Sequence, residues 1–304
     1  MTTRIGVDLG GTKIEAVVVD VGGDAPSVRA KKRVATERDR GYEHVLDTTR
    51  QLVLGLAEDA GVDVSKTPIG IGMPGSTTTL LPDGSRSSVP LIKNSNTTCL
   101  NGRPFRAELE EAIGRSIAFA NDANCFALAE ATWGAARGAR VAFGVILGSG
   151  VGGGLVFDGK AWDGAQGIAG EWGHIPLLVD SPDAVTCYCG KRGCIETILG
   201  GPFIEAAYAR RTGTQKKLVE IPPDDPLIGE RVELFGRALA IIVNVVDPDV
   251  IVLGGGVSNM SALYTDGVAA VARWTFNDEL RTKIVKHALG DSAGVLGAAL
   301  LPES

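Results

Sequence analysis

The chain has 304 residues, of which 44% are hydrophobic and 22% charged, and its formal net charge is -6. This length favours two domains over one. The composition, with 41 glycines, is typical of a compact folded protein and excludes general disorder. The acidic balance argues against nucleic acid as the main partner, because phosphate contacts need clustered Lys and Arg.

The cellular compartment is inferred from the start of the chain and from its apolar runs. Residues 1–4 lead directly into a strand pattern, and no run of about eighteen apolar residues occurs. We therefore expect a cytoplasmic protein with no membrane partner. There the five cysteines should stay reduced, and we expect Cys99 and Cys125 to be lone thiols.

The first predicted unit is a strand, a glycine turn and a strand. Residues 5–9 alternate as a strand, residues 10–13 (Gly-Gly-Thr-Lys) interrupt it, and residues 14–19 resume it. The same plan returns at residues 145–158, where an ungapped shift of 138 residues places Val7 on Val145. A duplicated domain is the simplest explanation.

Helical periodicity follows each of the two units. We expect helices at residues 42–60, 106–113, 124–133, 202–211, 231–246 and 261–274, with strands at 68–73, 117–120 and 249–253. This alternation predicts an α/β protein with mixed sheets covered by helices, in which two lobes enclose a ligand cleft.

The glycine turns are candidate phosphate sites. Residues 10–13 and 148–154 each follow a strand, and residues 254–256 follow a third one; backbone N–H groups in such turns can approach an anion closely. A single turn would more often be a tight hairpin, but the repetition favours phosphate binding. Residues 148–153 match G-x-G-x-x-G, yet a strand follows where a dinucleotide fold needs a helix, and no Walker A motif is present.

Asp122 is the candidate catalytic group. It lies between a predicted strand and a predicted helix, where a kinase can place the base that accepts a hydroxyl proton. A helix N-cap is the competing interpretation. Glu171, His174 and Glu196 stand among glycine and apolar neighbours, as surface residues seldom do, although each alone would usually be a structural polar group.

A metal site is predicted by the spacing H-x12-C-x-C-x4-C, formed by His174, Cys187, Cys189 and Cys194. Four ligands of this type suit tetrahedral zinc, and a complete set leaves no position for a substrate, so the zinc should be structural. Filling of the core by clustered cysteines is the less favoured alternative.

Together these motifs resemble the ROK sugar kinases (repressor, open reading frame, kinase). The resemblance covers essentially the whole chain, and it is carried by the segments 8–13, 121–124, 148–154, 171–174, 187–196 and 249–256. It implies an α/β fold of two actin-like (ribonuclease H-like) domains with the ligand cleft between them. The implied domains are 1–118, completed by a C-terminal helix at 290–304, and 119–289, which carries the zinc loop.

The resemblance also implies roles for residues. Asp122 would be the general base, and the sugar would be held by Gly75, Asn96, Asn121, Asp122, Glu171, His174 and Glu196. ATP phosphates would be bound by Gly10, Gly11, Thr12, Lys13, Gly148, Ser149 and Gly150, where Ser149 replaces the usual threonine of the family. Asp8 would help to organise Mg2+. The adenosine would be bordered by Gly254, Gly255, Gly256 and Val257.

Within the family, the loop at residues 94–102 and the Cys-Tyr-Cys-Gly form of the metal loop are most similar to bacterial fructokinases that also accept mannose. The implied reaction is ATP-dependent formation of fructose 6-phosphate. Glucokinase, mannokinase and N-acetylglucosamine kinase remain alternatives, and relatives suggest a homodimer. A sugar-responsive repressor is less favoured, because only four residues precede Ile5 and no basic helix is apparent. The retained Asp122 opposes a catalytically inactive sugar-binding module.

Overall fold

The computed structural model describes residues 1–302, which form two five-stranded mixed sheets and a separate two-stranded hairpin. The first sheet has the order β3-β2-β1-β4-β7, with β1 Thr2–Leu9, β2 Lys13–Val21, β3 Ser27–Ala35, β4 Ile69–Met73 and β7 Ala118–Asn121. The second sheet has the order β10-β9-β8-β11-β12, with β8 Val141–Leu147, β9 Val151–Phe157, β10 Lys160–Ala161, β11 Val250–Gly254 and β12 Lys283–Lys286.

The two sheets have the same topology. In each, the first strand pairs antiparallel with the second, which pairs antiparallel with the third, and the remaining two strands run parallel to the first. β1 and β2 thus correspond to β8 and β9, the segments that a shift of 138 residues superimposes. The duplication inferred from the sequence is confirmed.

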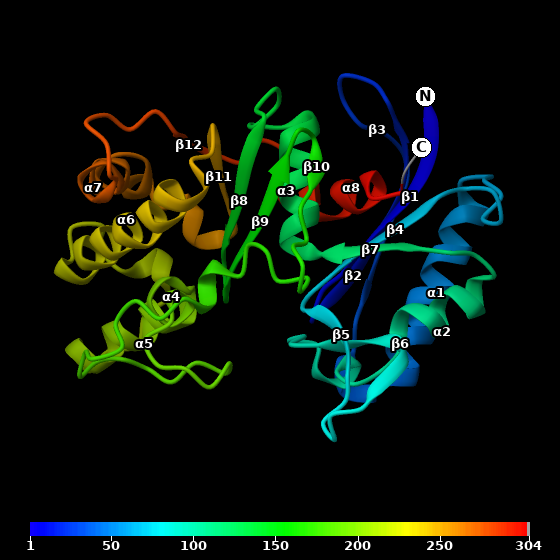
Figure 1. Ribbon diagram of the computed structural model, residues 1–304, viewed down its shortest axis with the longest axis horizontal. Coiled ribbons are helices and arrows are strands. Elements are labelled where there is room, and N and C mark those ends of the chain that lie inside the picture. The colour runs from blue at the N-terminus through cyan, green and yellow to red at the C-terminus, as the bar shows by residue number, and fades with distance from the viewer. Residues whose placement is uncertain (303–304) are drawn as a thin grey trace.

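Helices cover the sheets and fill the space between them (Figure 1). Their bounds are α1 Tyr42–Asp59, α2 Phe105–Ile113, α3 Asp122–Trp133, α4 Ile195–Leu199, α5 Gly201–Thr212, α6 Pro226–Val246, α7 Asp266–Trp274 and α8 Ala293–Leu300. α3 and α8 lie against each other between the two sheets, with α3 on β8 and β9 and α8 on β1 and β4. α1 packs against β2 and β3 in the first lobe.

Two glycines allow α8 to lie directly on the first sheet. A Cβ atom on Gly6 of β1 would be 2.2 Å from the carbonyl oxygen of Val295, and one on Gly70 of β4 would be 1.9 Å from that of Ala298. Real Cβ atoms do not tolerate such distances, so only glycine permits this packing. The C-terminal helix therefore packs on the first lobe as expected. The domain limits at 118 and 289 stay a prediction, and residues 303–304 of the last segment lie outside the described residues.

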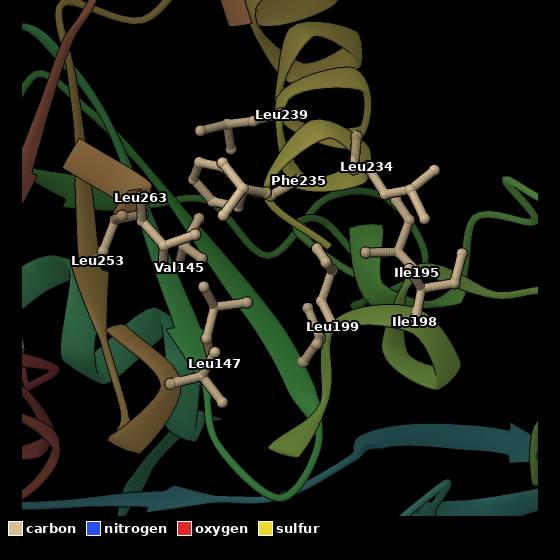
Figure 2. Packing of buried hydrophobic residues seen from close by; sticks show 14 of the residues in the cluster. Val145, Leu147, Ile195, Ile198, Leu199, Leu234, Phe235, Leu239, Leu253 and Leu263 are labelled. Carbon is tan, nitrogen blue, oxygen red and sulfur yellow. The ribbon is translucent and has the colours of Figure 1, made fainter. Parts of the chain in front are cut away.

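The core of the second lobe fixes the elements that carry the later motifs. Figure 2 shows Val145 and Leu147 of β8, Leu253 of β11 and Phe235 of α6, which belong to one buried cluster and are all at most 1% exposed. Leu199 of α4 packs into the same cluster. Burial of such side chains typically contributes about 1.5–3 kcal/mol each, so α4 and the loop before it are anchored to the sheet.

Some elements differ from the sequence-based expectation. The helix predicted from 261 begins only at Asp266, because Ser261–Tyr264 form a 3-10 helix. The short helix α4 and the hairpin β5 Ser76–Leu80 with β6 Arg86–Lys93 were not expected. In the described part of the chain, no helix combines the length and apolar character needed to cross a membrane.

Candidate active site

The strand β7 delivers Asp122 to the cleft at the start of α3. Asn121 is the N-cap of that helix, since its Oδ1 accepts a hydrogen bond from the Ala123 N–H at 2.9 Å. Asp122 is the first helical residue, and its Oδ1 lies 2.9 Å from the same N–H. The competing N-cap interpretation of Asp122 therefore applies to its neighbour Asn121. Burial raises the pKa of the Asp122 carboxyl above its usual value.

Asp122 shares a cavity with Asp8, which projects from β1. The cavity has a volume of about 260 Å³, and its wall includes Gly254, Gly255 and Gly256 after β11. Burial, followed by the charge of Asp122, raises the pKa of Asp8 to about 7. The cavity therefore joins the candidate base, the candidate cation ligand and the glycines expected beside adenosine. Val257, by contrast, is buried in the core of the second lobe.

The first glycine turn is fixed by hydrogen bonds to the end of β3. The Gly10 N–H donates to the Lys13 carbonyl at 2.9 Å. Thr36, which is fully buried, donates its hydroxyl to the Gly10 carbonyl at 2.7 Å and its N–H to the Thr12 carbonyl at 3.0 Å. The turn is thus held on both sides, and Thr12 at its tip is exposed.

The second glycine turn connects β8 to β9. The Gly148 N–H donates to the Gly150 carbonyl at 2.9 Å, and the Gly201 N–H donates to the Gly148 carbonyl at 2.8 Å. Nothing lies within 4 Å of a Cβ placed on Gly148, whereas one on Gly150 would be 2.5 Å from Oε2 of Glu196. The space beside Gly148 is open to a ligand. Ser149, which lies between Gly148 and Gly150 in the turn, is exposed.

The four predicted metal ligands come together. The ligand atoms of His174, Cys187, Cys189 and Cys194 all lie within 4.8 Å of one another. The two Sγ atoms of Cys189 and Cys194 are 3.7 Å apart, and Nδ1 of His174 is 3.5 Å from Sγ of Cys187. Tetrahedral zinc with Zn–S bonds of about 2.3 Å places sulfur atoms about 3.8 Å apart. The residues therefore fit a zinc ion bound through Nδ1 of His174.

The other ring nitrogen of His174 faces away from the thiols. Its Nε2 lies 3.0 Å from the Tyr188 hydroxyl and 3.9 Å from Oε2 of Glu171. Burial raises the pKa of Glu171, and the charges of Asp122 and Glu196 raise it further. Glu171 thus lies close to His174 and within electrostatic reach of Asp122 and Glu196, the other candidate sugar ligands of this lobe.

The remaining candidate sugar ligands lie on the first lobe. The Asn121 side chain donates from Nδ2 to the Gly75 carbonyl at 3.1 Å. Asn96 lies against the first glycine turn, with its Oδ1 3.5 Å from a Cβ placed on Gly11. Asn96, which was predicted to be a sugar ligand, therefore lies at the candidate phosphate turn.

Three polar groups near these sites were not identified from the sequence. Asp163 accepts a hydrogen bond from Nδ2 of buried Asn124 at 2.9 Å and lines a cavity of about 240 Å³ with Asn121. His287 lines the Asp8 cavity, and Arg38 lies beside Gly11. Of these three, only Asp163 could have been sought from the sequence, because Asn124 is a polar residue inside an apolar helical pattern and a buried amide requires partners.

Comparison with known proteins identifies relatives along the whole chain. A model of the ROK family matches residues 4–304. The chain is 36% identical over 315 aligned residues to the N-acetyl-D-glucosamine kinase of Vibrio vulnificus strain YJ016, covering 97% of this chain and 98% of that protein. The fold is similar to that of the ROK hexokinase from Thermus thermophilus, with a TM-score of 0.81, 31% identity, and coverage of 99% of this chain and 97% of that one.

A second structure is a ROK family glucokinase from Streptomyces griseus in complex with glucose and AMPPNP. Its TM-score is 0.76 at 27% identity, and the match covers 98% of both chains. The expected fold class, two actin-like α/β domains, is confirmed.

Proposed function

The chain belongs to the ROK family, and from that premise we propose that it is an ATP-dependent sugar kinase that transfers the γ-phosphoryl group to a hexose hydroxyl. The observation that carries the proposal is the position of Asp122, which shares one cavity with Asp8 and the glycines 254–256. A base for the sugar hydroxyl thus stands beside the proposed nucleotide site, which is the arrangement that phosphoryl transfer requires.

Asp122 would accept the proton of the attacking hydroxyl. Its Oδ1 is oriented by the Ala123 N–H, and burial raises its pKa, which makes the carboxylate a stronger base. Phosphoryl transfer depends mainly on positioning and charge stabilisation. We assign those tasks to the two glycine turns, whose backbone N–H groups would hold the phosphates.

Mg2+ would be held through Asp8. Burial and the charge of Asp122 raise the pKa of Asp8 although Lys13 and Arg33 lower it, and a bound divalent cation would add positive charge beside both carboxylates. The bound cation would neutralise phosphate charge.

Zinc would affect the sugar site by fixing the orientation of His174. With Nδ1 of His174 on the metal, Nε2 points to the Tyr188 hydroxyl and to Glu171, because a metal fixes the orientation of its histidine ligand. A sugar hydroxyl would take the place of the Tyr188 hydroxyl at Nε2. The same loop leads into α4, which carries Glu196.

For the sugar, we infer N-acetyl-D-glucosamine as the first candidate, since the curated relative from Vibrio vulnificus is named for that substrate. D-fructose is the second candidate, because the loop 94–102 resembles the fructokinase form. Two hydrogen bonds close that loop: the Ser95 N–H donates to Oδ1 of Asn101 at 2.9 Å, and Nδ2 of Asn101 donates to the Ser95 carbonyl at 3.0 Å.

A coupled assay of ADP release with N-acetyl-D-glucosamine, fructose, mannose and glucose tests both the kinase activity and the preferred sugar. A dominant kcat/KM for one of the first two sugars decides between them. If wild-type protein loaded with zinc and supplied with Mg2+ and ATP phosphorylates none of the four, the hexose kinase proposal is wrong.

A further inference from the structure

Arg38 is a cation at the first glycine turn that no carboxylate neutralises. It belongs to the 3-10 helix Arg38–Arg40 and makes one hydrogen bond, from Nη1 to the Asn96 carbonyl at 3.0 Å. Within residues 1–302 it forms no ion pair, whereas Arg40 of the same short helix pairs with Glu37 at 2.7 Å. The guanidinium therefore keeps free donors beside the turn.

Arg38 and a second donor that lacks an acceptor, the Thr97 hydroxyl, both lie beside Gly11. A Cβ on Gly11 would lie 3.2 Å from Nη1 of Arg38 and 3.7 Å from the hydroxyl oxygen of Thr97. Thr97 is fully buried, and its hydroxyl has no hydrogen-bond partner in the described part of the chain. A buried hydroxyl without a partner is costly, so an acceptor is missing at this point.

The missing acceptor is expected to be an anion. The turn 10–13 is the proposed phosphate site, and Asn96, whose carbonyl holds Arg38, is a proposed sugar ligand. Arg38 therefore contacts one proposed sugar ligand, Asn96, and lies beside the proposed phosphate turn at Gly11. The charge of Asp122 acts on both Asp8 and Glu171, and carboxylates grouped in this way repel a phosphoryl group.

We propose that Arg38 binds the phosphoryl group in transfer, with the Thr97 hydroxyl as a second donor. The inference rests on the proposed function. In that step the sugar oxygen forms a bond to the γ-phosphorus, the bond from the γ-phosphorus to the β–γ bridging oxygen breaks, and the hydroxyl proton passes to Asp122. Arginine suits this task because its planar fork binds two phosphoryl oxygens at once and keeps its charge at neutral pH.

The neighbouring structure allows Arg38 to act without being needed for folding. Buried Thr36 fixes the end of β3 to the turn through the Gly10 carbonyl, so the backbone near residue 38 is held independently of the arginine side chain. Arg38 itself is exposed, and its replacement should leave the melting temperature nearly unchanged.

The test compares Arg38→Met with the matched control Arg40→Met, which removes the same charge from the same 3-10 helix. Titration calorimetry with AMPPNP and with ADP, in the presence of Mg2+, separates the transferred group from the rest of the nucleotide. For Arg38→Met we expect AMPPNP affinity to fall about tenfold or more, ADP affinity to change less than about twofold, and kcat to fall about a hundredfold.

Arg38→Lys should recover part of kcat, because lysine restores the charge without the fork. Arg40→Met should behave as wild type. Unchanged AMPPNP affinity and kcat in Arg38→Met would overturn the inference while leaving the kinase proposal intact, as would equal weakening of ADP and AMPPNP. Wild-type protein that neither binds AMPPNP nor phosphorylates any of the sugars removes the proposed function, and this inference with it.

Discussion

The backbone N–H of Val151 donates a hydrogen bond to Oε2 of Glu196 at 3.1 Å. The second glycine turn is thereby tied to the carboxylate that follows the zinc loop. The other oxygen of Glu196, Oε1, lies 3.8 Å from the Cys187 thiol. One side chain thus links the proposed phosphate turn, the proposed metal site and the proposed sugar group.

This link predicts different outcomes for two alanine substitutions in one turn. Gly150→Ala places a Cβ 2.5 Å from Oε2 of Glu196, which must displace that carboxylate, so we expect the sugar KM to rise about tenfold, equivalent to about 1.4 kcal/mol. Gly148→Ala meets nothing within 4 Å and should leave the sugar KM unchanged while raising the ATP KM if phosphate binds there. Steady-state kinetics on both variants checks this, and identical changes in both would contradict it.

Zinc binding should be coupled to proton release. Burial raises the pKa of the Cys187 thiol to about 12, so in metal-free protein this thiol is protonated at neutral pH, and the metal must displace the proton. We expect zinc affinity to rise with pH and Cys189→Ser to lose both the metal and sugar affinity. The exposed Asp183, replaced by alanine in the same loop, serves as the control. Elemental analysis that finds no zinc in wild-type protein would speak against the site.

The sequence was sufficient for features that are local or repeated. The duplicated turns at Gly10 and Gly148, the helix after Asn121 and the His174 metal group all follow from spacing, and all appear where expected. Features that depend on segments far apart in the chain were not accessible. Arg38 reaches Gly11 and Asn96 only because three loops converge, and no local pattern in the chain marks it. The homodimer stays a prediction.

Asp8 should make the stability of the cation-free protein depend on pH. Its pKa is raised to about 7 by burial and by Asp122, so the folded state binds a proton that the unfolded chain releases near pH 4. The resulting stability is present below about pH 4 and is lost as pH rises through about 7. Asp8→Asn removes the titrating group, so its Tm should exceed that of wild type at about pH 8 and by less at about pH 5.

Wild type and Asp8→Asn also test whether Mg2+ binds at Asp8. Mg2+ added at about pH 8 should raise the Tm of wild type, because a divalent ion compensates the buried charge, and should have little effect on Asp8→Asn. Differential scanning calorimetry measures both effects. A wild-type Tm that rises relative to Asp8→Asn between about pH 5 and 8 would show that the sign of the Asp8 shift is wrong.

The last prediction separates catalysis from folding at the start of α3. Asp122→Asn keeps an oxygen that can accept the Ala123 N–H, and the N-cap itself is Asn121, so the Tm should not fall. Asn121→Ala, in contrast, removes the cap and should cost about 0.5–2 kcal/mol of stability. An amide cannot accept the hydroxyl proton, so kcat of Asp122→Asn should drop on the order of a hundred to ten-thousandfold, with the Kd values of sugar and nucleotide nearly intact. Measuring kcat, sugar Kd and Tm on both variants distinguishes the roles, and if Asp122→Asn retains more than about a tenth of wild-type kcat, another residue is the base.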